Sequence, residues 1–129
     1  MGPEFLIDTN ILVYYFDDQI PTHAALTVDE IFSESFNISI ITSIEFLGWH
    51  KYDERQYQKA VLFAKGANVI SLTEEIANKA IDLRRRKQIK LPDAVIAATC
   101  LVNHFTLVTR NQDDFKGIEG LELYNPFAS

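Results

Sequence analysis

Four short segments of this chain each end an apolar run with acidic or amide side chains. They span residues 5–10, 40–45, 91–93 and 107–114, so they are spread over the whole length. None of the four contains a histidine or a lysine. If the fold brings them together, they form a pocket of carboxylates. Such a pocket binds a divalent cation, and its most common chemistry is hydrolysis of phosphodiester bonds.

Two of the acidic residues, Asp8 and Glu45, are each open to a purely structural explanation. Asp8 lies between an expected strand and an expected helix, where Asp8, Thr9 and Asn10 all suit the N-cap; a cap through Thr9 or Asn10 would leave Asp8 to face the cleft. Glu45 follows Thr42 with the spacing of a capping box. Its neighbours are strongly apolar, however, which predicts a buried carboxylate. A bound metal would offset the cost of that burial.

Asp93 is the strongest single candidate. An Asp in the first turn of a helix is normally stabilised by the helix dipole and exposed. The helix expected at 93–103 has no obvious polar face, so we expect Asp93 to enter the core at the edge of the sheet. Asp113 and Asp114 lie in a polar loop, and a solvated turn explains at least one of them, because adjacent side chains cannot both point the same way.

The elements around these residues alternate between strands and helices. Apolar runs predict strands at 4–7, 37–41, 68–72 and 105–109, with a short fifth at 121–124. Helical spacing predicts helices at 11–16, 23–36, 42–50, 55–65, 74–83 and 93–103, with Ser71 and Glu74 as a capping box, Gly66 as a C-cap and Pro92 in a first turn. The predicted fold class is therefore α/β, a parallel sheet between two layers of helices. Ligands of such folds bind beyond the carboxyl ends of the strands.

Length and composition indicate one domain, residues 1–129, with 47% hydrophobic residues to fill its core. Cys100 is the single cysteine, which rules out an internal disulfide, and we expect it to be a small core residue. No apolar run reaches the ~18 residues of a transmembrane helix. Residues 1–4 are too short and acidic for a signal peptide, and part of them is open to being a cloning remnant. We therefore expect a cytoplasmic protein.

Together the four segments resemble the PIN-domain ribonucleases, specifically the VapC-type toxins of bacterial VapBC toxin–antitoxin pairs. The resemblance rests on Asp8-Thr-Asn, Glu45, Leu91-Pro-Asp93-Ala-x-Ile-Ala-Ala and Leu107-Val-Thr-Arg-Asn-x-x-Asp-Phe115. It runs from Phe5 to Phe127 in order and spacing, and the part from residue 90 to 115 is the most specific. It implies a three-layer α/β/α sandwich whose parallel sheet has four to five strands.

The resemblance also implies a set of site residues. Asp8, Glu45 and Asp93 would bind Mg²⁺ or Mn²⁺, and Asp114 would complete the catalytic acids. The family often has a fourth acid where this chain has Asn111, which can still supply a neutral oxygen or orient a water. The residues expected to hold the acids or position the substrate are Thr9, Asn10, Ser43, Thr109, Arg110 and Asn111.

The implied activity is that of a metal-dependent endoribonuclease acting as a toxin. Its expected partners are an RNA substrate, a cognate antitoxin and a second copy of the chain in a homodimer, with no membrane. The aromatic residues expected to line a groove for an antitoxin helix, or else to lie in the core, are Tyr14, Tyr15, Phe16, Trp49 and Tyr52.

Charge leaves part of this prediction open. The net charge of −6 argues against a general nucleic-acid binder, although an acidic site contributes several of those charges and a bound metal would offset some. The dense basic cluster at Arg84–Lys87 and Lys90 is equally explained by RNA contact and by the solvated C-terminal end of a helix. Arg110 could touch a phosphate or accept an inhibitory contact.

Two other function classes remain. A phosphoaspartate enzyme of the haloacid-dehalogenase type also begins with a strand and an Asp, but it would require a second Asp where this chain has Asn10. A non-catalytic PIN-fold interaction module, binding an antitoxin or another partner, would keep the fold and lose turnover because of Asn111.

Overall fold

The computed structural model describes residues 2–128. Met1 and Ser129 lie outside the described residues. Both belong to the predicted domain of residues 1–129, and Met1 also belongs to the suspected cloning remnant. The strands are β1 (Phe5–Ile7), β2 (Asn37–Ser39), β3 (Asn68–Ile70), β4 (Thr106–Val108) and β5 (Leu123–Tyr124). The α-helices are α1 (Thr9–Phe16), α2 (Ala25–Glu34), α3 (Ile40–Leu47), α4 (Glu54–Ala64), α5 (Glu74–Arg86) and α6 (Leu91–Asn103), and the 3₁₀ helices are η1 (Thr22–Ala24) and η2 (Gln112–Asp114).

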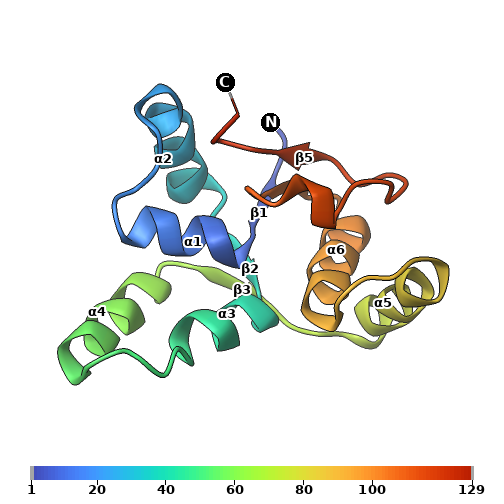
Figure 1. Cartoon of the computed structure of the whole chain (residues 1–129), viewed down its shortest axis with the longest axis horizontal. Helices are drawn as coiled ribbons and strands as arrows, with labels where there is room; N and C mark the ends of the chain where they lie inside the picture. The colour runs from blue at the N-terminus through green and yellow to red at the C-terminus, as the bar shows by residue number, and fades with distance from the viewer. Residues whose placement is uncertain (1, 129) are drawn as a thin grey trace.

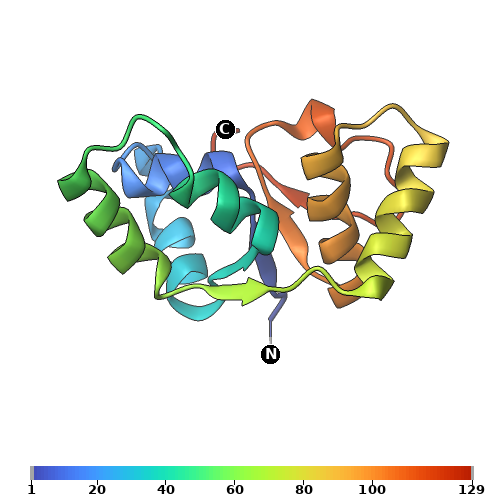
Figure 2. The same ribbon diagram turned by 90° about the horizontal axis from the view of Figure 1, so that it is seen from below.

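The strands form one sheet in the order β3-β2-β1-β4-β5, and every pair is parallel. Helices cover both faces, with α1, α2 and α4 on one side and α5 and α6 on the other (Figures 1 and 2). The predicted three-layer α/β/α sandwich with a parallel sheet is therefore confirmed. Its short strands are buried in the middle of the sheet, as the continuous apolar runs predicted.

The two faces of the sheet bury different kinds of side chain. Ile7 and Val108 point to a face rich in aromatic rings, which we call the aromatic face; its helices are α1 to α4, with Phe32 and Phe46 in the core. Leu6 and Leu107 point to the opposite face, the aliphatic face, which α5 and α6 cover. Successive strand residues alternate between faces, so each central strand serves both cores.

On the aliphatic face the core is built from small and branched side chains. The buried residues of α6 run without a break from Ala94 to Cys100. Cys100 is a free thiol inside this core, where burial raises its pKa, and its predicted role as a small core residue is confirmed. Among residues 2–128 no helix combines the length and hydropathy that a membrane span requires.

Several predicted helix ends are wrong by a few residues. Helix α3 begins directly after β2 because Ser39 caps it, its Oγ accepting the Ile41 N–H at 3.1 Å. Thr42 is thus the third residue of the helix, and its predicted capping box with Glu45 is not formed. Likewise α5 is capped by Thr73, whose Oγ1 accepts the Ile76 N–H at 3.2 Å, rather than by a box starting at Ser71.

The remaining helix ends give one confirmed prediction and two corrections. Pro92 lies in the first turn of α6, as predicted. The C-cap of α4 is Lys65 and not Gly66, since Lys65 keeps a helical backbone. At the start of α4 the sequence analysis missed a capping box between Asp53 and Gln56, in which each side chain accepts a backbone N–H of the other residue.

Candidate active site

The four predicted segments meet at the edge of the sheet where the strands have their carboxyl ends. Asp8 follows β1, and its N–H donates to the Val108 carbonyl of β4 at 2.9 Å. Thr109 follows β4 directly. In Figure 2 the chain enters β1 from below, while η2, the α5–α6 junction and the start of α6 lie together at the opposite edge. The parallel sheet therefore brings residues about 100 positions apart to the same place.

Asp8 is the most firmly held acid of the site. Its Oδ1 accepts the Thr9 N–H at 2.8 Å, and its Oδ2 accepts from Asn10 Nδ2 at 2.9 Å and from the Thr109 hydroxyl at 2.8 Å. The side chain is 5% exposed. Burial raises its pKa to about 6, and the charge of Asp93 adds to the rise, while the three hydrogen bonds oppose it.

These bonds decide between the capping alternatives and support other predictions. Of the three candidates Asp8, Thr9 and Asn10, it is Asp8 that caps α1, which begins at Thr9. The expected supporting roles of Asn10 and Thr109 are visible as direct hydrogen bonds to the Asp8 carboxylate. Asn10 does more than predicted, because its Oδ1 also accepts the Arg110 N–H at 3.1 Å and ties the loop after β4 to α1.

Glu45 lies at the rim of the site rather than in the core. It is exposed, as are its neighbours Ile44 (62%) and Trp49 (51%), because α3 turns this side outward. The predicted burial of Glu45 is therefore wrong, and burial no longer argues for a metal there. Its position depends instead on Thr9, whose hydroxyl donates to Glu45 Oε1 at 2.7 Å and lies 2.9 Å from Thr42 Oγ1.

Asp93 is half-buried in the first turn of α6. Burial raises its pKa, and the negative charges of Asp114 and Glu45 raise it further, while Lys90 opposes them. Asp93 also raises the pKa of Asp8. Asp93 is therefore the acid that connects the four, because the charges of Asp114 and Glu45 act on it and its own charge acts on Asp8.

The loop after β4 separates the two acids that the sequence could not distinguish. Asp113 lies 3.7 Å from Lys116 Nζ and forms an exposed ion pair. Asp114 is the one whose charge acts on Asp93. Asn111 is exposed, and its N–H donates to Thr109 Oγ1 at 3.0 Å. Ser43 makes no side-chain hydrogen bond with any described residue, so its role stays a prediction.

The side chain of Arg110 is held by aromatic rings that the sequence analysis did not connect to it. Its Nη1 donates to the Tyr14 hydroxyl at 2.8 Å. Its guanidinium lies 5.2 Å from the centre of the Tyr14 ring and 4.3 Å from that of Phe127. The sequence offered no signal for this contact, because Phe127 reaches Arg110 only through the path of the C-terminal segment after β5.

The donor chemistry of the site can be compared with the needs of a metal ion. Across residues 2–128, no three acidic, histidine or cysteine side chains converge closely enough to form a ready-made metal cage. Mg²⁺ does not require one, since it keeps several waters and uses one or two carboxylates. An all-oxygen set of acids that repel one another suits such a hard cation, and the residues present fit it in this sparse form.

Hollows adjoin the acids, and two of them bear on function. One, of about 510 Å³, is lined by the acids Asp93, Asp113 and Asp114 together with the cations Arg84, Lys87 and Lys90. The second, of about 410 Å³, has Thr9 and Glu45 at its edge, and its walls are mainly apolar: Val13, Phe16, Phe46, Trp49 and Tyr52.

The structure decides between a groove and a core position for the five aromatic residues that the sequence left open. Phe16, Trp49 and Tyr52 line the apolar hollow. Tyr15 belongs to the core, stacked at 3.7 Å on Phe32, and Tyr14 packs against Phe127.

Comparison with known proteins identifies the family. The profile of the PIN domain matches residues 5–121. The fold is shared with a toxin–antitoxin complex from Klebsiella pneumoniae, at 33% identity and a TM-score of 0.77, over 98% of this chain and 100% of that one. It is also shared with VapBC2 from Rickettsia felis bound to a promoter DNA fragment, at 25% identity and a TM-score of 0.78, over 94% and 97% of the two chains.

A third structure, VapBC-1 from nontypeable Haemophilus influenzae, has the same fold at 23% identity and a TM-score of 0.78, over 96% of this chain and 98% of that one. No curated protein matches the chain in sequence. The chain belongs to the PIN-domain family, and its predicted resemblance to the VapC type is confirmed. The phosphoaspartate alternative is thereby set aside.

Proposed function

We propose that this protein is a metal-dependent endoribonuclease and the toxin of a toxin–antitoxin pair. One observation supports this most strongly: at the carboxyl edge of a PIN-type sheet, the charges of Glu45 and Asp114 raise the pKa of Asp93, and the charge of Asp93 raises that of Asp8. Acids gathered in this way destabilise the fold, and carboxylates with raised pKa values concentrate at functional sites.

In this proposal Asp8, Glu45 and Asp93 hold Mg²⁺ or Mn²⁺. The ion, when bound, offsets the charge of the scissile phosphate and lowers the pKa of an attacking water. Three hydrogen bonds fix the Asp8 carboxylate, so it serves as the rigid ligand. Glu45 is oriented by Thr9, and Asp114 approaches from the loop after β4. Asn111 lies in the same loop and can orient a water.

The proposed partners follow from the surface next to the acids. The apolar hollow beside Glu45, edged by Asp17, suits an amphipathic helix that carries a basic residue toward the acids. We assign this surface to a cognate antitoxin, since the structural relatives named above are toxin–antitoxin complexes. A homodimer and a cytoplasmic location complete the proposal.

The competing function is a non-catalytic PIN module that only binds a partner. Two observations favour it: Asn111 occupies the position where the family often has an acid, and no three acids of the described chain converge. The two functions differ in whether the antitoxin-free protein cuts RNA.

The deciding experiment compares Asp93→Asn and Asp29→Asn with the wild type. We expect Asp93→Asn to lower the initial rate of RNA cleavage with Mg²⁺ or Mn²⁺ by roughly 100- to 1,000-fold, the scale for losing one group that stabilises transition-state charge. Asp29→Asn removes the same charge from an exposed residue of α2 that lines neither hollow, so its rate stays within about twofold. A wild type that cuts no RNA pool with either metal would favour the non-catalytic module.

A further inference from the structure

Positive charge is concentrated beside the acidic edge. Five of the chain's 12 Lys and Arg residues lie between positions 84 and 90, although the net charge is −6. Three of them, Arg84, Lys87 and Lys90, line the hollow of about 510 Å³ whose lining also includes Asp93, Asp113 and Asp114. We call these three residues the basic wall. The hollow falls within the ~300–1,000 Å³ range typical of ligand pockets.

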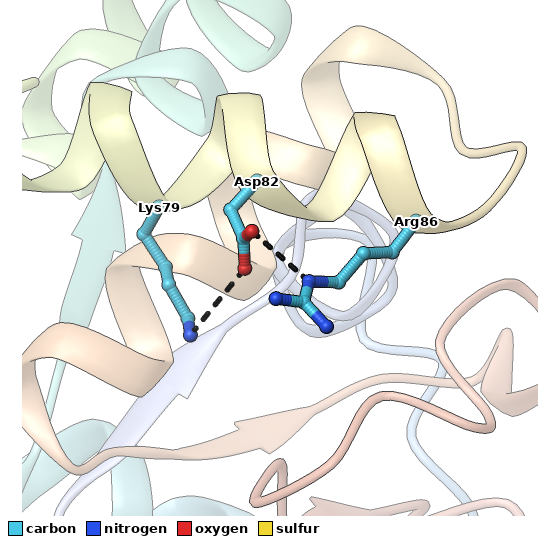
Figure 3. A network of polar contacts seen from close by, with 3 residues as sticks. All are labelled: Lys79, Asp82 and Arg86. Carbon is cyan, nitrogen blue, oxygen red and sulfur yellow. Dashed lines mark hydrogen bonds and ion pairs between the residues drawn. The ribbon is translucent and has the colours of Figure 1, made fainter.

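The five cations of this segment do not have the same surroundings. Arg86 is engaged by Asp82, with Nε 3.0 Å from Oδ1, and Lys79 Nζ lies 4.0 Å from the other carboxylate oxygen (Figure 3). Arg85 does not line the hollow of the basic wall. Within residues 2–128, no carboxylate lies within 4.0 Å of a charged nitrogen of the basic wall. The wall therefore keeps three positive charges available to a ligand.

One hydrogen bond and one buried side chain fix the segment that carries the basic wall. Lys87 ends α5, and its Nζ donates to the Lys116 carbonyl at 2.9 Å. Ile89, between Lys87 and Lys90, is buried in the same core as Leu83 and Ala94. The α5–α6 junction is thus held by the loop at Lys116 and by the aliphatic core, and its charged side chains line the same hollow as Asp93.

Helix stabilisation does not account for this arrangement. Cations at the C-terminal end of α5 interact favourably with the helix dipole. That effect acts on Arg85 and Arg86 as well and gives no reason for a shared hollow. Lys90, moreover, is the N-cap of α6, where the dipole disfavours a cation. A ligand with negative charge explains all three positions at once.

On the basis of the proposed nuclease function, we propose that Arg84, Lys87 and Lys90 bind an RNA backbone phosphate that neighbours the scissile one. Phosphate contacts fix the register and orientation of a nucleic acid without reading its sequence. Arg84 offers a planar fork suited to two phosphate oxygens, and the lysines act as point charges. The basic wall is therefore a positioning surface that lays the strand across the acids.

The test separates this surface from general charge attraction. In an Asp93→Asn background, which prevents cutting, Arg84→Gln/Lys90→Gln is compared with Arg85→Gln/Arg86→Gln. Both pairs remove two positive charges from the same segment, and Lys87 is left intact because it also holds the loop. Binding is measured by fluorescence anisotropy with a labelled single-stranded RNA over a salt series, and circular dichroism checks the fold of each variant.

We expect the basic-wall pair to weaken binding about tenfold or more. The slope of log affinity against log salt becomes shallower by about 0.7 for each phosphate of a single strand that the variant no longer neutralises. The control pair stays within about twofold. Arg84→Lys/Lys90→Arg, which keeps the charge, restores most of the affinity. Equal weakening by the two Gln pairs would overturn the proposal, because it would show diffuse attraction.

A second readout uses the protein with Asp93 intact. The basic-wall pair raises KM for RNA about tenfold, while kcat changes by less than about threefold. If the wild type cuts RNA and the pair has an unchanged KM, this inference fails and the proposed function stands. If the wild type neither binds nor cuts RNA, both fail.

Discussion

The aromatic and the aliphatic face of the sheet hold their acids in different ways. At the junction of β1 with the aromatic face, Asp8 accepts three hydrogen bonds, and on α3 Glu45 accepts one from Thr9. On the aliphatic face, Asp93 makes no side-chain hydrogen bond with any residue of the described chain. Its place is set by the first turn of α6 alone.

This difference follows from the packing of each face. Helix α6 buries three alanines in the aliphatic core, so its backbone lies close to the sheet, and the helix itself rather than a hydrogen bond positions Asp93. The aromatic face packs large rings, such as Phe46 against Phe16 and Phe63, and leaves the positioning of its acids to hydroxyl and amide groups. The site thus joins one rigid acid, Asp8, which hydrogen bonds hold, to one, Asp93, which only its helix positions.

The largest expected effect concerns the aromatic face. Phe46 is fully buried and contacts rings from α1 and α4, so Phe46→Ala leaves a cavity that the rigid rings cannot fill. We expect a loss of roughly 3–5 kcal/mol in the free energy of unfolding, against roughly 0.5–1.5 kcal/mol for Ile96→Val on the aliphatic face. Urea unfolding measures both. A loss below about 1 kcal/mol for Phe46→Ala would show that this face repacks freely.

The rigid acid makes the stability of the metal-free protein depend on pH. The pKa of Asp8 is about 6 in the folded state against 3.8 without the fold, so between these values the folded state binds more protons. Its stabilising contribution is complete below pH 3.8 and is lost as the pH rises through 6. At ~1.4 kcal/mol per pKa unit, the loss is about 3 kcal/mol.

Urea unfolding in EDTA between pH 4 and pH 7 measures this loss. The control is Asp8→Asn, which has no proton to bind at this position, so its stability should fall less over the same range. Parallel pH profiles for the wild type and the variant would contradict the assigned pKa of Asp8.

The smallest expected effect tests a single hydrogen bond of the rigid acid. The Thr109 hydroxyl lowers the pKa of Asp8, so Thr109→Val should raise that pKa further, by roughly 0.5–1 unit for a bond of about 1 kcal/mol. Thr99→Val is the matched control, because Thr99 is equally buried but donates to the Val95 carbonyl. A carbon-13 NMR titration of the Asp8 carboxyl measures both. Equal shifts in the two variants would assign the effect to general repacking.

The sequence by itself determined the layers of this fold and the edge that carries the acids. Apolar runs with short connections predict a parallel sheet, and acids that follow parallel strands meet at their carboxyl ends. This rule placed Asp8 and the loop at 111–114 at that edge, and the position of Asp93 in the first turn of a buried helix placed it there too. The caps of α3 and α5 were not predicted correctly. Ser39 and Thr42 suit an N-cap equally well by residue type, as do Ser71 and Thr73, and only the end of the preceding strand decides where the helix starts.

Only the tertiary structure decided what surrounds each charged side chain. The exposure of Glu45 depends on how α3 lies against the sheet, and the separation of Asp113 from Asp114 depends on the 3₁₀ turn that directs one to Lys116. Arg86 turns to Asp82 while Arg84 faces the acids, although the two arginines are two residues apart. Hydrophobic periodicity is a local property of the chain, whereas the field at a carboxylate is a sum over segments that meet only after folding.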